Sequence, residues 1–314
     1  AAASAEAGRR LRSSPLVRRI AREHQLDLGL IPGTGAAGRI TRDDVLRYLA
    51  RREPAAPPPV AGFAAPPSGQ AVPAPAAVLS TPPRQPLTRM RAIIAERMVE
   101  SKRISPHVHT VYKVDMTRVV RLREREKSRF EQLHGVKLTF MPFLAAAAVE
   151  ALGKFPLVNA SLIDGAIHYH SQINLGIAVA LEWGLIVPVV KNAEERSFLG
   201  LARAIADLAS RARAKKLQPE EVEGSTFTLT NSGIFGDEFS TPIIHQPNSA
   251  ILAIGGLRKE PVVLTDAEGN DTIAIRSMQH FTLGFDHRLI DGADACRFMS
   301  EFKQTLEGWD REIG

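Results

Sequence analysis

The chain has 314 residues, a mass of 34.2 kDa and a formal net charge of +6. Its 44% hydrophobic and 24% charged residues exclude wholesale disorder, and it lacks the run of about 18 apolar residues that a membrane-spanning helix requires. A single cysteine excludes a disulfide framework and a cysteine-based zinc site, and it indicates a reducing compartment. The first residues have neither a starting methionine nor the apolar core of a signal peptide, so we expect further sequence upstream.

The positive charge is confined to the first 52 residues, which hold eleven arginines against five acidic residues. The rest of the chain carries 29 basic and 29 acidic residues, so it is formally neutral. A pI near 9.7 would by itself suggest nucleic-acid binding. Because the excess sits in one short segment, we predict instead docking onto an acidic protein partner, with neither nucleic acid nor membrane as a partner.

Residues 13–50 are predicted to form a small helical domain, preceded by a linker tail over residues 1–12. A serine before Pro15 predicts the start of a first helix, because serine caps helices and proline suits their first turn. Thr41, followed three residues later by Asp44, predicts the start of a second helix in a pattern close to a capping box. A unit this small approaches the lower size limit for independent folding.

The loop of this domain, Gly33-Thr-Gly-Ala-Ala-Gly38, matches the dinucleotide-binding fingerprint G-x-G-x-x-G. That fingerprint requires a preceding strand and an acidic residue about 20 positions further on, and the sequence offers neither. We therefore interpret the glycines as residues that permit tight backbone turns.

Residues 51–85 are predicted to form a flexible linker rich in alanine and proline. Eleven of the 21 prolines fall within residues 53–86, and large apolar side chains are scarce there. Proline removes backbone donors, and such a composition cannot bury a core. At about 3.1 Å per residue in an extended polyproline conformation, the arm would reach on the order of 100 Å.

Residues 86–314 alternate helical and strand signals, which predicts an α+β domain arranged as a two-layer sandwich with the helices to one side of a sheet. The expected helices are Leu87–Lys102, Thr117–His134, Phe140–Leu152, Phe198–Lys216 and Asp291–Leu306. The expected strands are His107–Asp115, Ile173–Ala180, Leu185–Val190, Thr226–Thr230, Ala250–Gly255 and His280–Phe285.

The string FDHRLIDG, at residues 285–292, ends an apolar strand and precedes a helix. His287 thus falls at a strand end, and a histidine is the natural base for a thiol or hydroxyl near neutral pH. Asp291 is placed to orient the imidazole or a neighbouring arginine. A second strand ends in hydroxyl residues, and the hydroxyl of Thr230 there could donate a hydrogen bond to a developing oxyanion.

The small domain resembles the peripheral subunit-binding domain of 2-oxo acid dehydrogenase complexes, through SPLVRRIAREHQLDLGLIPGTGAAGRITRDDVLRYLA. The resemblance implies that residues 13–50 bind the decarboxylase component or dihydrolipoamide dehydrogenase. It assigns Arg18, Arg22 and Arg39 to that contact, since guanidinium groups pair bidentately with carboxylates. The alternative is that the helix arginines form only a solvated face.

The large domain resembles the catalytic domain of dihydrolipoamide acyltransferases, from about Pro86 to Trp309. The strings that carry this resemblance are PLTRMRAIIAERM, LTFMPF, FPLVNAS, GLIVPVVKNA, GSTFTLTN and FDHRLIDGADA. It implies a fold like that of chloramphenicol acetyltransferase. The implied reaction moves an acyl group, succinyl or acetyl, between a dihydrolipoyl thiol and coenzyme A.

The resemblance also implies roles for single residues. His287 would deprotonate the attacking thiol, Thr230 would bind the tetrahedral oxyanion, and Asp291 would maintain the geometry. Arg123 and Thr139, in the strings LRE and TFMPF, would lie on the coenzyme A side, and no metal is required. In the family the active site lies between the subunits of a trimer, so His287 and Thr230 are expected from different chains.

The same resemblance extends to assembly and location. It implies homotrimers that assemble into a 24-mer or 60-mer core, served by a lipoyl group on a lipoyl domain upstream of this chain. It implies a cytoplasmic protein of bacterial type, with the mitochondrial matrix as the alternative. The chain departs from relatives at Ala180, where an acid is common, and at His245, where asparagine is common. The resemblance therefore does not determine the residues of the substrate channel.

Other candidate side chains carry weaker signals. Cys296 is a potential nucleophile, but it falls inside a predicted helix. His107 with His109, and His168 with His170, have a spacing on strands that can chelate a metal. No further ligands lie nearby in the sequence, so we expect ordinary strand histidines.

Two other functions remain open from the sequence: a non-catalytic docking scaffold of the same complexes, and a small-molecule acyltransferase that uses coenzyme A. A scaffold has no need to keep a histidine base, an aspartate and a threonine together in these motifs. A free enzyme has no use for a subunit-binding domain on a long arm. Both features favour the acyltransferase core.

Overall fold

The computed structural model describes five ranges of the chain: 13–24, 26–35, 38–50, 86–181 and 184–313. The chain divides into two compact units, Ala1–Thr81 and Pro82–Gly314. The predicted linker tail and the predicted Ala/Pro arm lie outside the described residues. Within the described ranges, no helix has both the length and the apolar character needed to cross a bilayer.

The first unit contains two short helices, α1 (Pro15–Glu23) and α2 (Arg42–Ala50), with the 3₁₀ turn η1 (Leu28–Leu30) between them. Helix α1 begins where the sequence predicts, because Ser14 Oγ accepts a hydrogen bond from the backbone N–H of Val17 at 3.3 Å. A small apolar core joins the two helices. Its buried members are Val17, Ile31, Ile40 and Val45.

The predicted capping box at the start of α2 is present, and it also closes the loop. The Thr41 N–H donates to the Asp44 carboxylate at 2.9 Å, and the Asp44 N–H donates to Thr41 Oγ1 at 3.4 Å. The same carboxylate accepts the N–H and the hydroxyl of Thr34 at 3.0 and 2.7 Å. These bonds, led by the Thr34 N–H, hold the pKa of Asp44 well below its usual range. A Cβ on Gly33 would lie 2.5 Å from the Gly38 carbonyl oxygen, so close backbone packing explains that glycine.

The second unit is an α+β domain, as the sequence predicts. Its helices are α3 (Arg89–Ile104), α4 (Thr117–His134), α5 (Met141–Lys154), α6 (Phe198–Arg213) and α7 (Gly292–Glu307). Its strands are β1 (His107–Asp115), β2 (Ala160–Ile163), β3 (Ala166–Tyr169), β4 (Leu175–Ile177), β5 (Val179–Leu181), β6 (Gly184–Ile186), β7 (Val189–Val190), β8 (Phe227–Asn231), β9 (Ala250–Thr265) and β10 (Asp271–Asp286). Its 3₁₀ turns are η3 (Pro156–Asn159), η4 (Ala193–Glu195), η5 (Pro219–Glu221) and η6 (Gly233–Phe235).

Six strands form the main sheet, in the order β1-β10-β9-β8-β4-β7. The pairs β1/β10, β10/β9 and β4/β7 are antiparallel, whereas β9/β8 and β8/β4 are parallel. The pairs β2/β3 and β5/β6 form two further, separate ladders. The sheet is therefore mixed. Strands β8 and β10 run in opposite directions, so their carboxyl-terminal ends do not lie side by side.

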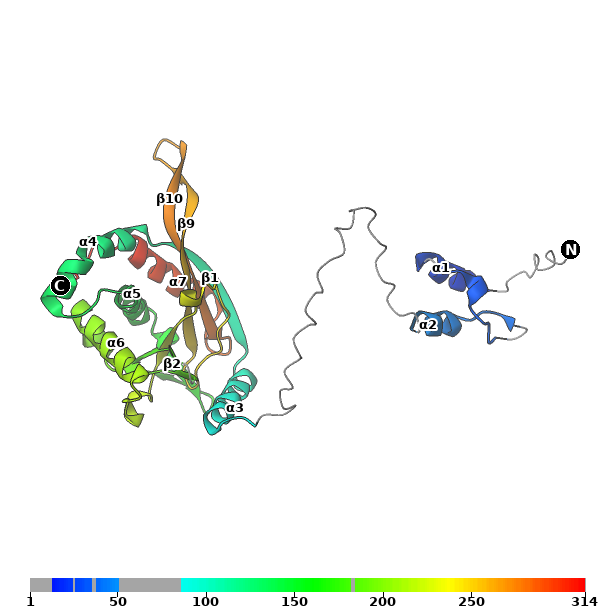
Figure 1. The fold of residues 1–314 in the computed structure, drawn as a ribbon, viewed down its shortest axis with the longest axis horizontal. Coiled ribbons are helices and arrows are strands. Elements are labelled where there is room, and N and C mark those ends of the chain that lie inside the picture. The colour runs from blue at the N-terminus through cyan, green and yellow to red at the C-terminus, as the bar shows by residue number, and fades with distance from the viewer. Residues whose placement is uncertain (1–12, 25, 36–37, 51–85, 182–183, 314) are drawn as a thin grey trace, which may run out of the picture. The chain divides into compact units, whose positions relative to one another are not determined.

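One face of the sheet carries the apolar core, and helices α4 to α7 lie on that side (Figure 1). Alternate residues of the three central strands point into the core, because side chains along a strand alternate between its two faces. These residues are Phe227, Leu229, Ala250, Leu252, Ile254, Phe281, Leu283 and Phe285, all at most 1% exposed. The predicted two-layer arrangement is confirmed on this face.

The opposite face is more polar, and the chain segment 237–249 covers it. Asn248 donates its side-chain amide to Thr228 Oγ1 at 3.0 Å. His109 Nε2 lies 2.9 Å from the carbonyl oxygen of Pro242. Hydroxyl and imidazole groups of the sheet thus hydrogen-bond to this cover segment, which also buries the side chain of Ile244.

The largest difference from the sequence prediction concerns β9 and β10. We expected Ala250–Gly255 and His280–Phe285, but the strands run on as a long hairpin whose tip projects from the domain (Figure 1). Charged residues interrupt the apolar pattern there, and the apolar side chains that remain are exposed: Ile273 is 79% exposed. A period-two pattern predicts a strand only when one face is buried, so this extension carried no such signal.

Smaller differences follow the same logic. The hairpin β2–β3 was not predicted, and the two apolar strands expected around residue 183 are split into four short ones. Helix α3 begins two residues later than expected, after its cap Thr88, and within the described chain its apolar residues stay largely uncovered; Ile93 is 50% exposed. The amphipathic spacing thus predicted the helix correctly. It did not predict whether the apolar face of that helix is buried by the same chain.

Candidate active site

The turn that follows β10 presents His287 to solvent. Its backbone N–H donates to the carbonyl oxygen of Pro106 at 3.1 Å, which fastens the turn to the start of β1. The imidazole is exposed and lies beside Phe285, with ring centroids 5.8 Å apart. Its ring nitrogens form no hydrogen bond with any described residue, so they are free to meet a reactant.

Asp286, directly before the histidine, was missed by the sequence analysis. Its carboxylate is 3% exposed and accepts hydrogen bonds from Ser105 Oγ at 2.7 Å and from the Arg288 guanidinium at 2.7 and 3.0 Å. Burial opposes ionisation of this carboxyl, but the bonds from Arg288 and Ser105 outweigh it and lower the pKa. The acid and the arginine that flank the histidine in FDHRLIDG were the available signal.

Asp291 caps the helix that follows the histidine turn. Its Oδ1 accepts the backbone N–H of Asp294 at 2.8 Å, so it caps the N-terminus of α7. This backbone hydrogen bond lowers the pKa of Asp291. The arginine beside the histidine, Arg288, is bound by Asp286 instead, and within the described chain Asp291 has no hydrogen bond to His287 or Arg288.

Thr230, near the end of β8, lies on the same face of its strand as Thr228, which accepts a hydrogen bond from Asn248 of the cover segment. It is half-buried, and its hydroxyl has no hydrogen-bond partner among the described residues. The sheet register measures its separation from the histidine turn: Thr230 is level with Ala253, and Ala253 is level with Thr282. Asp286 lies four residues further along β10, about 13 Å along the strand, and β10 is two strand spacings from β8, about 10 Å across the sheet. The Cα atoms of Thr230 and Asp286 are therefore about 16 Å apart within one chain.

Arg123 and Thr139, expected on the coenzyme A side, lie close to each other where α4 connects to α5. The Nε of Arg123 donates to the carbonyl oxygen of Leu138 at 2.9 Å, and its guanidinium lies 4.9 Å from the ring centroid of Phe140. Both neighbours of Thr139 thus contact this arginine. Helix α4 starts just after Asp115, whereas His287 follows Asp286, which pairs with His107 at the opposite end of β1.

The three arginines expected to dock a partner are exposed on the first unit. Arg18 and Arg22 are one helical turn apart on α1, so they share a face. Ser13 accepts a hydrogen bond from Arg18 and pairs with Ile40, which brings Arg39 close to the start of α1. None of the three forms an ion pair with a described residue, and their guanidinium groups remain available to a partner.

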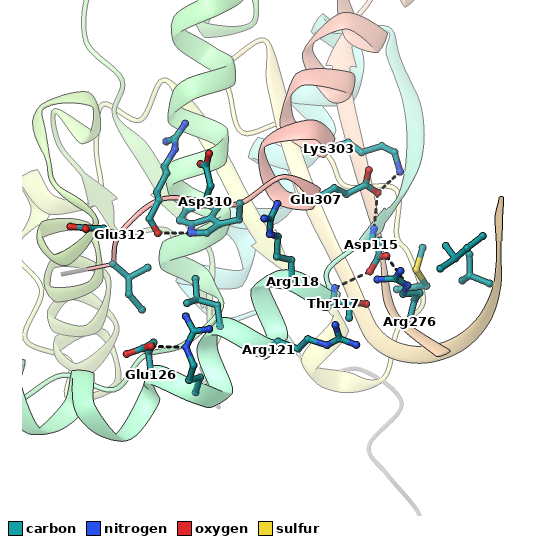
Figure 2. Close-up of a pocket in the computed structure, with 18 of the residues that line it drawn as sticks. Asp115, Thr117, Arg118, Arg121, Glu126, Arg276, Lys303, Glu307, Asp310 and Glu312 are labelled. Carbon is teal, nitrogen blue, oxygen red and sulfur yellow. Dashed lines mark hydrogen bonds and ion pairs between the residues drawn. The ribbon is translucent and has the colours of Figure 1, made fainter. Parts of the chain in front are cut away.

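A groove of about 1240 Å³ lies between α4, the base of the β9–β10 hairpin and the C-terminal residues. Figure 2 shows Arg118 and Arg121 of α4 between Asp310 and Glu312 on one side and Arg276 on the other. None of the predicted site residues lines this groove. Size alone therefore does not locate the site that the motifs indicate.

The remaining candidates stay separate from the histidine turn. Cys296 is exposed on α7, inside a helix as predicted. His107 has both ring nitrogens engaged: Nδ1 lies 2.7 Å from the Ser105 carbonyl oxygen, and Nε2 accepts the Ile244 N–H at 2.9 Å. Such a ring is neutral and has no lone pair left for a metal. Among the described residues, no group of three histidine, cysteine or acidic side chains is placed to hold a metal ion.

His245, one of the two departures from the family pattern, is part of the cover segment. Its Nδ1 lies 3.4 Å from Ser225 Oγ, and burial together with the charge of Arg97 lowers its pKa. Ala180, the other departure, lies in β5 and is exposed.

The fold and the site define a class first. A small helical unit exposes three arginines, and a separate α+β unit presents a histidine on a hydrogen-bonded turn at a strand end. The family model "2-oxoacid dehydrogenases acyltransferase (catalytic domain)" matches residues 80–312, and the model "e3 binding domain" matches residues 11–46. The chain belongs to the 2-oxoacid dehydrogenase acyltransferase family, as its motifs predicted.

The named relatives include both acetyltransferase and succinyltransferase components. The chain is 43% identical to the dihydrolipoyllysine-residue acetyltransferase component of the pyruvate dehydrogenase complex of Corynebacterium glutamicum, over 94% of this chain and 43% of that protein. It is 41% identical to the succinyltransferase component of the 2-oxoglutarate dehydrogenase complex of Cupriavidus necator, over 93% of this chain and 70% of that protein. The chain thus spans about half the length of the first relatives it matches.

Among solved structures, the dihydrolipoamide acetyltransferase of Azotobacter vinelandii is similar, with a TM-score of 0.67 and 34% identity. The match covers 71% of this chain and 90% of that one. The work on that protein concerned the role of one serine, one histidine and one asparagine in its catalytic mechanism.

Proposed function

We propose that this chain is the acyltransferase core of a 2-oxo acid dehydrogenase complex, which moves an acyl group from a dihydrolipoyl thiol to the thiol of coenzyme A. The observation that carries the proposal is His287, an exposed imidazole whose ring nitrogens bond to no described residue, on a turn that backbone and carboxylate bonds hold in place. A base in this position needs only to reach one incoming thiol.

The chemistry required of the chain is modest. An imidazole nitrogen of His287 removes the proton of the attacking thiol, whose pKa of about 8.5 makes this step easy near neutral pH. The thiolate attacks the thioester carbonyl, and the Thr230 hydroxyl donates a hydrogen bond to the oxyanion of the tetrahedral intermediate. The intermediate collapses, the other thiol leaves as its thiolate, and the imidazolium of His287 returns the proton.

The separation of about 16 Å between Thr230 and Asp286, the residue before His287, supports an active site shared between chains. One chain would contribute His287, and its neighbour in a trimer would contribute Thr230. In the Azotobacter vinelandii enzyme, the histidine and asparagine named for catalysis are four positions apart, the same spacing as His287 and Asp291. The correspondence supports a role for Asp291, although its carboxylate also caps α7.

The acyl group stays open between acetyl and succinyl, because relatives of both kinds match at similar identity. The test is an assay of acyl transfer to free dihydrolipoamide with acetyl-, succinyl- and isobutyryl-coenzyme A. His287→Ala should lower kcat about 100-fold or more, the usual loss for a missing general base. His168→Ala, an exposed histidine on β3, is the matched control and should leave kcat unchanged. Near-normal transfer in the His287→Ala chain would overturn the mechanism.

The first unit has its own proposed task, which is to dock an acidic surface of the decarboxylase component or of dihydrolipoamide dehydrogenase. The exposed Arg18, Arg22 and Arg39, which form no ion pair with a described residue, support it, as does the match to the e3 binding domain model. The double variant Arg18→Ala with Arg22→Ala should weaken binding to dihydrolipoamide dehydrogenase and flatten its salt dependence, since fewer charge pairs form. Unchanged affinity at two salt concentrations would refute the assignment.

The wider setting is proposed on the same basis. The lipoyl group would be supplied by a lipoyl domain upstream, and trimers would assemble into a 24-mer or a 60-mer core. Bacterial relatives support a cytoplasmic location. Coenzyme A would contact the region of Arg123 and Thr139, where a guanidinium and an exposed hydroxyl lie side by side.

A further inference from the structure

The carboxylate of Asp286 is the junction of a small polar network at the end of β10. It accepts the Arg288 backbone N–H at 3.0 Å and two further bonds from the guanidinium of the same residue. On its other side it accepts the hydroxyl of Ser105 at 2.7 Å. One buried carboxylate thus binds both the backbone and the side chain of the residue that follows His287.

This network fixes the backbone on both sides of the histidine. The Asp286 carbonyl oxygen accepts the N–H groups of Leu289 and Ile290 at 3.0 and 2.9 Å, and the Asp286 N–H donates to Ser249. The His287 N–H itself is held by Pro106. Every backbone N–H from residue 286 to 290 therefore has a partner, and the main freedom left to His287 is rotation of its side chain.

The network also connects the turn to distant parts of the chain. Ser105 directly follows α3, and it accepts the side-chain amide of Gln246 at 2.8 Å. Gln246 belongs to the cover segment over the polar face of the sheet. The histidine turn is thus hydrogen-bonded to the end of α3 and, through Ser105, to the segment that covers the polar face of the sheet.

We propose that Asp286 is a positioning residue for acyl transfer: through Arg288 and Ser105, it holds the turn that carries His287 in the orientation the base requires. The inference rests on the proposed function. It assigns to Asp286 the arginine clamp that the sequence suggested for Asp291.

The alternative is that the network only stabilises the fold, and the rate per folded molecule separates the two possibilities. The Arg288 side chain is 37% exposed, but its partner Asp286 is buried, so loss of the guanidinium leaves a buried carboxylate without its cation and lowers the melting temperature in either case. A displacement of about 1 Å at a catalytic group also lowers the rate about 100-fold. Below the melting temperature, a lower kcat therefore indicates the positioning role, and an unchanged kcat indicates a role in stability alone.

The decisive variants are Arg288→Ala and Asp286→Asn in the full chain, with Arg297→Ala as the control. Arg297 is also an arginine paired with a nearby aspartate, at 3.3 Å from Asp294, but it lies on the exposed side of α7. We expect kcat to fall about 10- to 100-fold in both decisive variants, with KM for acyl-coenzyme A and for dihydrolipoamide within a factor of about two. The kcat of Arg288→Lys should lie between those of the wild type and Arg288→Ala, because lysine keeps the charge but lacks the bidentate fork.

A second measurement does not depend on activity. Hydrogen exchange of the peptide that spans residues 285–290 should accelerate in Arg288→Ala and Asp286→Asn, with the rest of the chain unchanged. Ser105→Ala, which removes one bond and leaves the ion pair, serves if Asp286→Asn does not fold.

Two results would overturn the positioning role alone: wild-type kcat in Arg288→Ala, or a raised KM with unchanged kcat, which would make Arg288 a substrate contact. A wild-type chain without transfer activity on any acyl donor would overturn the proposed function, and the positioning role with it.

Discussion

Replacing Gly255 by alanine tests how tightly the cover segment is packed against the sheet. A Cβ at this position would lie 1.9 Å from the carbonyl oxygen of Glu238 and 3.1 Å from that of His280. Ordinary contacts begin near 3.5 Å, so backbone must move by about 1.5 Å. Because the obstacle is main chain rather than a flexible side chain, we expect a loss of about 3 kcal/mol. For a unit of this size, that corresponds to a fall in Tm of about 6 to 12 °C.

The displaced backbone lies close to the proposed oxyanion donor. A Cβ on Gly233, which follows the Thr230 strand, would already lie 2.2 Å from the Gly255 carbonyl oxygen. Scanning calorimetry and the acyl-transfer assay should therefore both detect Gly255→Ala. Gly153→Ala is the matched control, because no atom lies within 4 Å of its Cβ and alanine favours the helix. If Gly255→Ala melts with the wild type and keeps its kcat, the described packing of the cover segment is wrong.

Two further predictions concern single titratable groups. Asp44→Ala should unfold the first unit, because this carboxylate joins Thr34 to Thr41 across the loop; hydrogen exchange of residues 13–50 should become unprotected, whereas in exposed Asp43→Ala it should not. The second unit should lose stability as the pH falls below about 6.5, because burial lowers the pKa of His107 and only the unfolded chain takes up the proton there. Urea denaturation from pH 8 to pH 5 measures this loss, and His107→Gln should reduce the slope. A pH dependence that is the same in His107→Gln and wild type would contradict the neutral ring.

The local signals in this sequence gave correct predictions where residues close together in the sequence form hydrogen bonds with each other. The cap at Ser14, the capping box at Thr41 and Asp44, and the bounds of α4 all follow from short-range chemistry. The hairpin of β9 and β10 did not, because its outer half is exposed and carries no burial pattern. Strand periodicity assumes that one face of the segment is buried, and an exposed hairpin tip has no buried face.

The motif FDHRLIDG shows the same division at the level of single residues. Its spacing predicted a histidine at a strand end, and the structure has His287 there. Which acid binds the neighbouring arginine could not be read from the spacing, because Asp286 and Asp291 are both within reach in the sequence. The start of α7 engages Asp291 as its cap, and the fold brings Ser105 to Asp286 across 181 positions.

By itself, the sequence determined the two-part organisation, the family, the confinement of the net charge to the first 52 residues, and the histidine motif, since all of these depend on residue identity and local order. Only the tertiary structure decided that Thr230 and His287 lie far apart within one chain, that the cover segment is fastened by hydroxyl and imidazole groups, and that Asp286 braces the histidine turn. These are contacts between segments distant in the sequence. They depend on strand register, and shifting a strand by one residue would turn every side chain to the other face.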